Sequence, residues 1–189
     1  MPRKPREEVA GGIHHVYARG NNRRVLFLDD VDRDGYLVLL GDVVKRQRWR
    51  CLTFCLMDNH VHLLIETPEP NLGDGMRRLH GDFARGLNRR HGSSGHVFQG
   101  RFGSKRLRNE GHLWTAVAYI AANPVAAGLC TAPERWSWGS HAAAAARGAL
   151  APSWLDLARL FALLSSSGGD PRRRYLDAVA ERCGRRSPD

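Results

Sequence analysis

Residues 50–67, RCLTFCLMDNHVHLLIET, predict two antiparallel strands joined by a tight hairpin. Asp58 and Asn59 separate two runs of strand-forming residues, and both tolerate the left-handed backbone of a two-residue turn. The register follows, with the expected pairs Leu56–Val61, Phe54–Leu63 and Leu52–Ile65. One face of the hairpin is then apolar, and His60 and His62 lie together on the opposite face.

Helix and strand patterns flank this hairpin on both sides. Asp29 or Asp30 is suited to cap a helix that runs to about residue 46. The other predicted elements are a strand over 12–20, a helix over 71–90, a strand or extended basic segment over 97–107, and a helix over 109–123. Pro124 should stop the last helix, because the residue before a proline is disfavoured in the helical region. The order predicts an α+β fold with helices on one face of an antiparallel sheet and the other face free for chemistry.

The composition favours one globular domain that binds a polyanion. The chain has 189 residues, 42% of them hydrophobic, and its 29 basic against 19 acidic residues give a formal net charge of +10. Nucleic acid is the commonest partner of such a field, although a basic surface can also serve solubility alone. The four cysteines follow no disulfide spacing, and neither a signal peptide nor a membrane span is evident. We therefore expect a cytoplasmic protein without membrane contact.

Two pairs of residues carry the candidate chemistry. His60 and His62, two apart on a strand, present two nitrogen ligands to one divalent ion, and an oxygen ligand from elsewhere would suit magnesium or manganese. Tyr119 and Asn123, four apart on a helix, share one face, where the phenol could attack phosphorus and the amide could bind metal. Taken alone, each pair also fits a plainer interpretation as hydrogen-bonded strand histidines, core filler and a helix end.

Four sequence blocks carry a family resemblance. They are HHVYARGNN (14–22), MDNHVHLLIE (57–66), FQGRF (98–102) and AYIAANPVAAGL (118–129). In this order they resemble the REP-associated tyrosine transposase branch of the single-tyrosine HUH, or IS200-like, transposases, over roughly residues 12–130. Relatives often carry a basic residue at the position of Ala126 and a polar one at that of Ala121, so substrate contact near the tyrosine helix departs from the family pattern.

The resemblance implies a ferredoxin-like fold with the histidine pair on a central strand. It implies that His60, His62 and Asn123 bind Mg²⁺ or Mn²⁺ and that Tyr119 is the catalytic nucleophile. Such enzymes cut single-stranded DNA at hairpin-forming palindromic repeats, become linked to the 5′ phosphate and reverse the step during strand transfer. Members of this branch are thought to be monomers, although related insertion-sequence enzymes form dimers.

Basic and polar residues outside the motifs are candidates for DNA contact. They are Arg19, Asn21, Asn22, Arg23, Arg77, Arg78, Arg85, Arg101, Lys105, Arg106 and Arg108. Phe98 and Phe102 lie among the last four and could stack bases, although phenylalanine more often belongs to the core. Each cation could equally be a solvated surface residue, and so could the arginines of residues 172–186.

The predicted organisation has three parts: a flexible basic N-terminus over 1–11, the HUH transposase domain over 12–130, and a helical extension with a basic tail over 131–189. Three other functions compete with the transposase. The first is a domesticated, non-catalytic binder of hairpin DNA. The second is a zinc protein that uses Cys51 or Cys55 with the histidines. The third is a replication-initiator or relaxase type of nicking enzyme.

Overall fold

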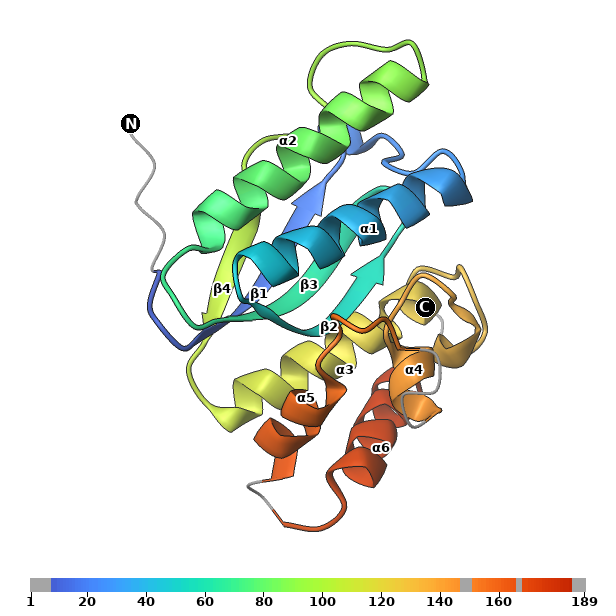
Figure 1. The fold of residues 1–189 in the computed structure, drawn as a ribbon. Coiled ribbons are helices and arrows are strands. Elements are labelled where there is room, and N and C mark those ends of the chain that lie inside the picture. Colours follow the sequence, from blue (N-terminus) through green and yellow to red (C-terminus); the bar gives the residue numbers. More distant parts are fainter. Residues whose placement is uncertain (1–7, 147–150, 166–167, 185–189) are drawn as a thin grey trace.

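A four-stranded antiparallel sheet forms the centre of the computed structural model, which describes residues 8–146, 151–165 and 168–184 (Figure 1). The strands are β1 (Gly12–Arg19), β2 (Arg50–Leu56), β3 (His60–Thr67) and β4 (Gly103–Leu107), in the spatial order β2-β3-β1-β4. The helices are α1 (Asp30–Arg46), α2 (Leu72–Arg90), α3 (Glu110–Ala126), α4 (His141–Ala145), α5 (Leu157–Leu164) and α6 (Pro171–Gly184). Short 3₁₀ turns are η1 (Asn21–Arg23) and η2 (Pro133–Arg135). The expected α+β, ferredoxin-like class is confirmed, and the histidine pair lies on an inner strand.

The central hairpin forms as its sequence predicts, with one irregularity. The Met57 amide donates to the His60 carbonyl over 2.8 Å, which closes the turn. The expected pairs Leu56–Val61 and Phe54–Leu63 are confirmed. The pair Leu52–Ile65 was wrong, because a bulge shifts the register between Cys51 and Thr53 and leaves Cys51 opposite Ile65.

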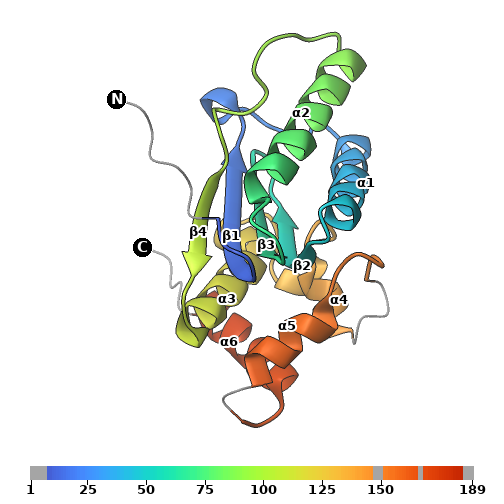
Figure 2. The ribbon, with the colours of Figure 1, turned by 60° about the vertical axis from the view of Figure 1, so that its left-hand side comes forward.

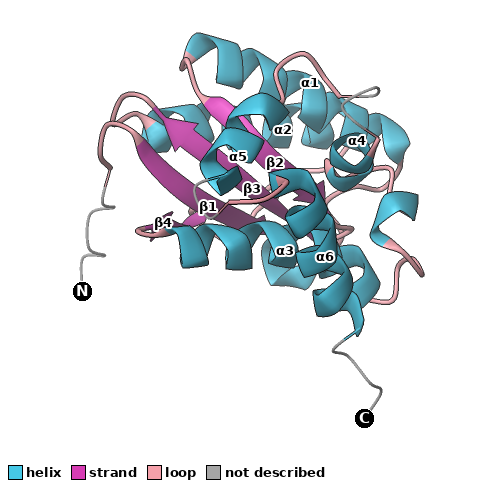
Figure 3. Cartoon of the chain, turned by 90° about the horizontal axis from the view of Figure 1, so that it is seen from below, coloured by secondary structure: helices cyan, strands magenta, loops and turns pink. Residues whose placement is uncertain are grey.

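Helices cover both faces of the sheet, so the expectation of helices on one face only was wrong. Helices α1 and α2 cover the face that carries Val16, Val61 and Leu63, as Figure 2 shows. Helix α3 lies across the other face against β2, β3 and β4, and α6 runs beside it (Figure 3). The physical reason lies in the composition of α3, which is apolar nearly all round and must be buried on several sides.

Helix α3 also continues through Pro124, contrary to the prediction that it ends before this residue. A proline removes only its own amide donor, and the following amides still close the last turn. Ala127 donates to the Asn123 carbonyl over 3.0 Å, and Gly128 donates to the Val125 carbonyl over 3.0 Å. Gly128 then takes the left-handed conformation (φ 71°) that ends helices.

The segments after residue 130 complete the open edge of β2. The Leu56 amide donates to the Trp138 carbonyl, and the Asp156 amide donates to the Cys51 carbonyl, each over 2.8 Å. Helices α5 and α6 then contribute buried side chains such as Leu160 to the same hydrophobic core as the sheet. An edge strand covered in this way offers fewer unpaired backbone groups to other chains.

Some expectations fall outside the described ranges. They concern residues 1–7 of the predicted basic N-terminus and Arg185 and Arg186 of the tail. Within the described residues, no helix has the length and apolar character needed to cross a lipid bilayer.

An ion pair to a buried carboxylate anchors α5 to β3 and yields a stability prediction. Arg159 donates two hydrogen bonds to the Glu66 carboxylate, at 2.7 and 2.9 Å, and the Glu66 side chain is only 8% exposed. Arg159→Ala should lower the free energy of unfolding by about 2 kcal/mol at pH 7, because it leaves a buried charge without its main partner. Urea denaturation measures this change.

The loss of stability caused by Arg159→Ala should disappear in acid. The hydrogen bonds from Arg159 lower the pKa of Glu66 below its ordinary 4.5, so the pair stabilises the fold above that pH and is lost as pH falls through the folded pKa. Arg77→Ala, which removes an exposed pair with Asp74, is the control and should change stability by less than about 1 kcal/mol. An equal loss in both variants would contradict the anchoring role.

Candidate functional site

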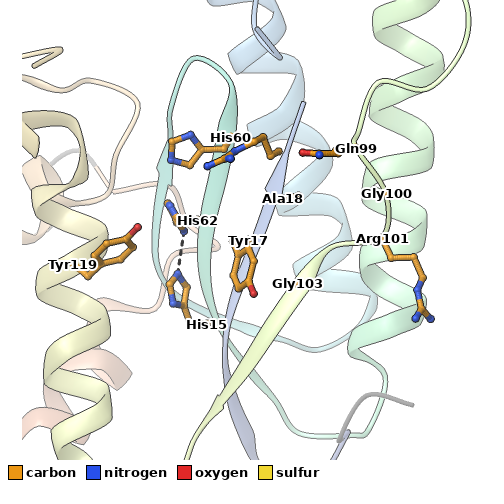
Figure 4. Close-up of a pocket in the computed structure, with 11 residues that line it drawn as sticks. His15, Tyr17, Ala18, His60, His62, Gln99, Gly100, Arg101, Gly103 and Tyr119 are labelled. Atoms are coloured by element: carbon orange, nitrogen blue, oxygen red, sulfur yellow. Dashed lines mark hydrogen bonds between the residues drawn. The ribbon is translucent and has the colours of Figure 1, made fainter. Parts of the chain in front are cut away.

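An open cavity of about 640 Å³ lies on the sheet face that α3 partly covers. It is bordered by β1, β3, the loop before β4, and α3 (Figure 4). The residues that line it are His15, Tyr17, Ala18, Arg19, His60, His62, Gln99, Gly100, Arg101, Gly103 and Tyr119. The structure thus brings together the histidine pair and the tyrosine that the motifs singled out.

The two histidines project side by side from β3, as strand alternation requires. Their ring centroids are 5.0 Å apart, and the rings are nearly perpendicular. His62 is buried at 6% exposure, whereas His60 lies nearer the hairpin turn and is partly exposed. Tyr119 points toward them from α3, and its ring centroid is 5.3 Å from that of His62 (Figure 4).

His15 is a site residue that sequence reasoning did not assign. Its Nε2 atom lies 3.0 Å from Nδ1 of His62, and its ring centroid is 5.8 Å from that of Tyr119. The antiparallel register places His15 on this face, because Tyr17 pairs with His62 and Arg19 with His60. The alternation of side chains along a strand over 12–20 would have placed residues 15, 17 and 19 on one face. Only the pairing of β1 with β3 shows that His15 meets His62.

The imidazoles of the site are held neutral at physiological pH. Burial, followed by the nearby His15, His60 and Arg19, lowers the pKa of His62 to about 3. Burial and the charge of Lys105 lower the pKa of His15 to about 4. The pKa of His60 is also lowered, mainly by burial. Neutral imidazoles are the form that can bind a metal ion through nitrogen.

The nitrogen atoms of the pair fit a divalent ion. His62 Nε2 is buried and has no hydrogen-bond partner, which is costly for a polar atom unless a ligand occupies that position. His60 Nδ1 lies 2.7 Å from the Asn59 side-chain oxygen, so this nitrogen donates and Nε2 keeps its lone pair. In the matching tautomer of His62, Nδ1 donates to His15 and Nε2 is left to coordinate.

Among the described residues, no third His, Cys, Asp or Glu completes a metal-binding group with the pair. No group of three or more His, Cys, Asp or Glu side chains suited to a metal occurs in the described part of the chain. Asn123 lies one turn after Tyr119 but lines a neighbouring cavity of about 410 Å³. Its Nδ2 atom is buried without a partner there. Arg182 of α6 lines the same cavity, with its Cζ atom 5.0 Å from the centroid of the Tyr119 ring.

The predicted DNA-contact residues divide between the two faces of the sheet. Arg19 and Arg101 line the histidine cavity, and Lys105 pairs with His15 on the same face. Arg106 pairs with His14 and so belongs to the opposite face. Asn21, Asn22 and Arg23 form the turn η1 at the end of β1, and Arg108 is an exposed residue just before α3.

The arginines of α2 lie on the far layer and are paired with acids of their own helix. Arg77 contacts Asp74 at 2.9 Å, Arg78 contacts Asp82 at 3.8 Å, and Arg85 also bonds Asp82. These exposed side chains belong to a mixed-charge surface on α2, a helix that covers the other face of the sheet from α3 (Figure 2). The three arginines are therefore not part of the cavity that holds the histidines and Tyr119.

The described residues give the zinc alternative no support. Burial raises the pKa values of the Cys51 and Cys55 thiols. Cys55 does pair with His62 across the hairpin, but its sulfur lies 3.6 Å from that of Met57. Neither cysteine belongs to a cluster of metal-ligating side chains in the described ranges.

Comparison with known proteins agrees with this geometry. The family described as "Transposase IS200 like" matches residues 9–123, which is more than half of the chain. The chain therefore belongs to the IS200-like transposase family. No curated protein shows a significant match to it.

A solved structure shares the fold of this chain. A REP-associated tyrosine transposase bound to a REP hairpin superposes with a TM-score of 0.67 at 21% identity, covering 80% of this chain and 89% of that one. A protein from Deinococcus radiodurans R1, also described as a transposase, gives a TM-score of 0.44 at 20% identity over 58% of this chain and 89% of that one. At 21% identity the first likeness shows a common fold.

Phe98 proves to be a core residue, at 9% exposure, and it stacks on His80 with ring centroids 4.0 Å apart. Phe102 is likewise buried, at 6% exposure. Both phenylalanines therefore belong to the core, which was the plainer of the two interpretations.

Burial of His80 also gives a pH-dependent stability. It lowers the pKa of His80 to about 3, from 6.5. Below pH 6.5 the unfolded chain takes up a proton that the folded chain excludes. His80 alone should then lower the unfolding free energy by about 1 kcal/mol for each pH unit below 6.5, in addition to the effect of the other buried histidines.

The measurement is urea denaturation at pH 7, 6 and 5, with His80→Gln beside the parent. Glutamine keeps hydrogen-bonding capacity toward Tyr36, whose hydroxyl lies 3.3 Å from His80 Nε2, but it does not titrate. The variant should show a shallower dependence on pH. His96→Gln, which removes an exposed loop histidine, is the control. Parallel pH profiles for all three proteins would contradict this assignment.

Proposed function

We propose that this transposase cleaves and rejoins single-stranded DNA through a covalent bond between Tyr119 and a 5′ phosphate. The observation that supports this most directly is the position of Tyr119, whose ring faces His62 across an open cavity. The hydroxyl oxygen would bond to phosphorus while the bond to the 3′ oxygen breaks and that oxygen takes up a proton. The reverse attack by a 3′ hydroxyl on the phosphotyrosine would transfer the strand and restore the phenol.

Mg²⁺ or Mn²⁺ is the proposed cofactor, with His60 and His62 as ligands. When bound, the ion would polarise a phosphate oxygen and offset the charge that develops during attack. Two observations support these ligands. His62 Nε2 is buried and has no hydrogen-bond partner. His60 Nε2 keeps its lone pair, because it is Nδ1 of that ring that lies against the Asn59 oxygen. Asn123 is the proposed third ligand, and its amide would have to turn from the neighbouring cavity to reach the pair.

The proposed substrate is a palindromic repeat that folds into a hairpin with a single-stranded flank. A relative with the same fold is bound to a REP hairpin. Arg19, Arg101 and Lys105, which lie on the face of the cavity, are the cations best placed for the cleaved strand. The remaining predicted contacts would serve a hairpin stem that extends beyond the cavity. We further propose that the protein acts as a monomer on bacterial nucleoid DNA in the cytoplasm.

A non-catalytic binder of hairpin DNA is the second candidate. It would explain the net charge of +10 but not the site. A binder has no use for a phenol facing two imidazoles, one of which keeps a buried nitrogen without a partner.

Tyr119→Phe separates these two candidates, because it removes one oxygen atom and leaves charge and packing nearly unchanged. The parent should cut labelled hairpin oligonucleotides, drawn from repeats beside its own gene, and become linked to the 5′ product when Mg²⁺ or Mn²⁺ is present. The variant should bind the same DNA but give at least about a thousandfold less covalent product, because phenylalanine lacks the hydroxyl that would attack phosphorus. Denaturing gels of both species measure this. Tight binding without cleavage by the parent under either metal would favour the binder.

Metal binding gives a second, independent test through His15. His15→Gln should weaken Mn²⁺ affinity roughly 10- to 100-fold, because the partner that orients a ligating imidazole tunes its metal affinity. Titration followed by electron paramagnetic resonance measures free Mn²⁺ directly. His60→Ala should abolish the site, and Asn123→Ala shows whether its amide contributes. His96→Gln, an exposed loop histidine, is the matched control. If His15→Gln and the control bind Mn²⁺ equally well, the orienting role is wrong.

A further inference from the structure

Tyr17 is an aromatic side chain in the cavity that the cleavage chemistry leaves without a role. Tyr17 is 47% exposed as a residue, whereas Tyr36 and Tyr175 are 0% and 1% exposed. Tyr17 projects from the middle of β1 beside His62, to which it is paired in register (Figure 4). A large aromatic group therefore faces the open space in which the proposed substrate must lie.

Gly103 on β4 makes room for this ring. It is paired with Tyr17 in register, so any side chain at position 103 would project on the same face. A methyl group built there would overlap three atoms of the Tyr17 side chain, two ring carbons and the hydroxyl oxygen. The missing side chain lets the ring extend over β4, at the cavity wall, while much of it stays open to solvent.

The loop before β4 forms another part of the cavity wall, and it is bonded to the end of β1. The Gln99 amide donates to the Arg19 carbonyl over 2.9 Å, and Gly20 forms a β-bridge with Phe98. These contacts hold the start of the loop before β4 against the end of β1, and the exposed residues Gln99 and Arg101 line the same cavity as Tyr17. A cavity that offers an aromatic ring, an amide and a guanidinium group suits a nucleobase and its phosphate.

The distances from the Tyr17 ring to the two histidines indicate which nucleotide would place its base against Tyr17. The centroid of the Tyr17 ring is 6.5 Å from that of His62 and 5.9 Å from that of His15. Successive nucleotides of one strand are separated by at least about 3.4 Å along a stacked helix and by more when extended. A base that contacts Tyr17 therefore lies within one or two nucleotides of a phosphate held at His62.

We propose that Tyr17, seated over Gly103, is a stacking platform for one unpaired nucleobase next to the cleaved phosphodiester. This inference rests on the proposed function and deepens it, because it assigns to the same cavity a subsite for a base besides the one for the phosphate. Stacking tolerates every base, so the subsite selects single-stranded over paired DNA at this position, and any preference among bases comes from Gln99 and Arg101.

The test measures binding in the Tyr119→Phe background, where cleavage does not interfere. Fluorescence anisotropy compares Tyr17→Ala and Tyr17→Phe on a hairpin oligonucleotide with short single-stranded flanks. Tyr17→Ala should bind about tenfold more weakly, whereas Tyr17→Phe should bind as the parent does, because phenylalanine keeps the aromatic face. Removal of single bases along the flank then locates the subsite. The penalty of Tyr17→Ala should disappear for one abasic position and persist for the others.

Gly103→Ala gives a second route to the same result. The added methyl group displaces the Tyr17 ring, so binding should weaken in the parent but hardly change further in Tyr17→Ala. Gly35→Ala on α1, where nothing lies within 4 Å of the added atom, is the matched glycine control. Thermal unfolding of each variant checks that the fold is intact.

The outcomes separate this inference from the proposed function. If the parent cuts hairpin DNA but Tyr17→Ala binds as tightly as the parent, or is weakened equally at every abasic position, the stacking platform is wrong and the cleavage mechanism stands. If the parent binds no hairpin or single-stranded DNA, the proposed function itself fails and the subsite fails with it. Disappearance of the penalty at one position beside the cleavage point would establish the platform.

Discussion

The antiparallel pairing of β1 with β3 is the constraint on which the site depends. It places His15, Tyr17 and Arg19 on the same face as Leu64, His62 and His60, their register partners. A slip of one residue would turn every side chain of β1 to the other face of the sheet. The apolar residues of the two strands prevent this slip, because Val16 and Leu63 are fully buried beneath α1 and α2.

The burial of α3 supplies the opposing wall. Its apolar surface packs on the sheet on one side and against α6 on another, which fixes the direction of Tyr119. Helix α6 is held in turn by Tyr175, whose hydroxyl lies 2.8 Å from His141 Nδ1, while Glu134 lies 3.1 Å from Nε2 of the same ring. Segments beyond residue 130 therefore help to position the tyrosine, and Arg182 reaches its ring from there.

The buried, low-dielectric surroundings of the histidines determine their protonation state in the cavity. Burial keeps the histidines neutral, and the cations Arg19 and Lys105 nearby lower the histidine pKa values further. These cations also attract a phosphate backbone, so one set of charges favours both metal-binding imidazoles and an anionic substrate. On α2, by contrast, acids of the same helix lie against the arginines and weaken their field.

Local patterns in the sequence determined the order of the elements, the hairpin turn and the shared faces of His60 with His62 and of Tyr119 with Asn123. Each of these follows from strand or helix periodicity within a few residues. Tertiary structure alone decided that α3 covers the second face, that His15 meets His62, that Asn123 opens into a neighbouring cavity, and that Tyr17 stands over Gly103. These features join residues from separate elements, and the packing of side chains across the sheet, rather than any local propensity, selects which of them meet.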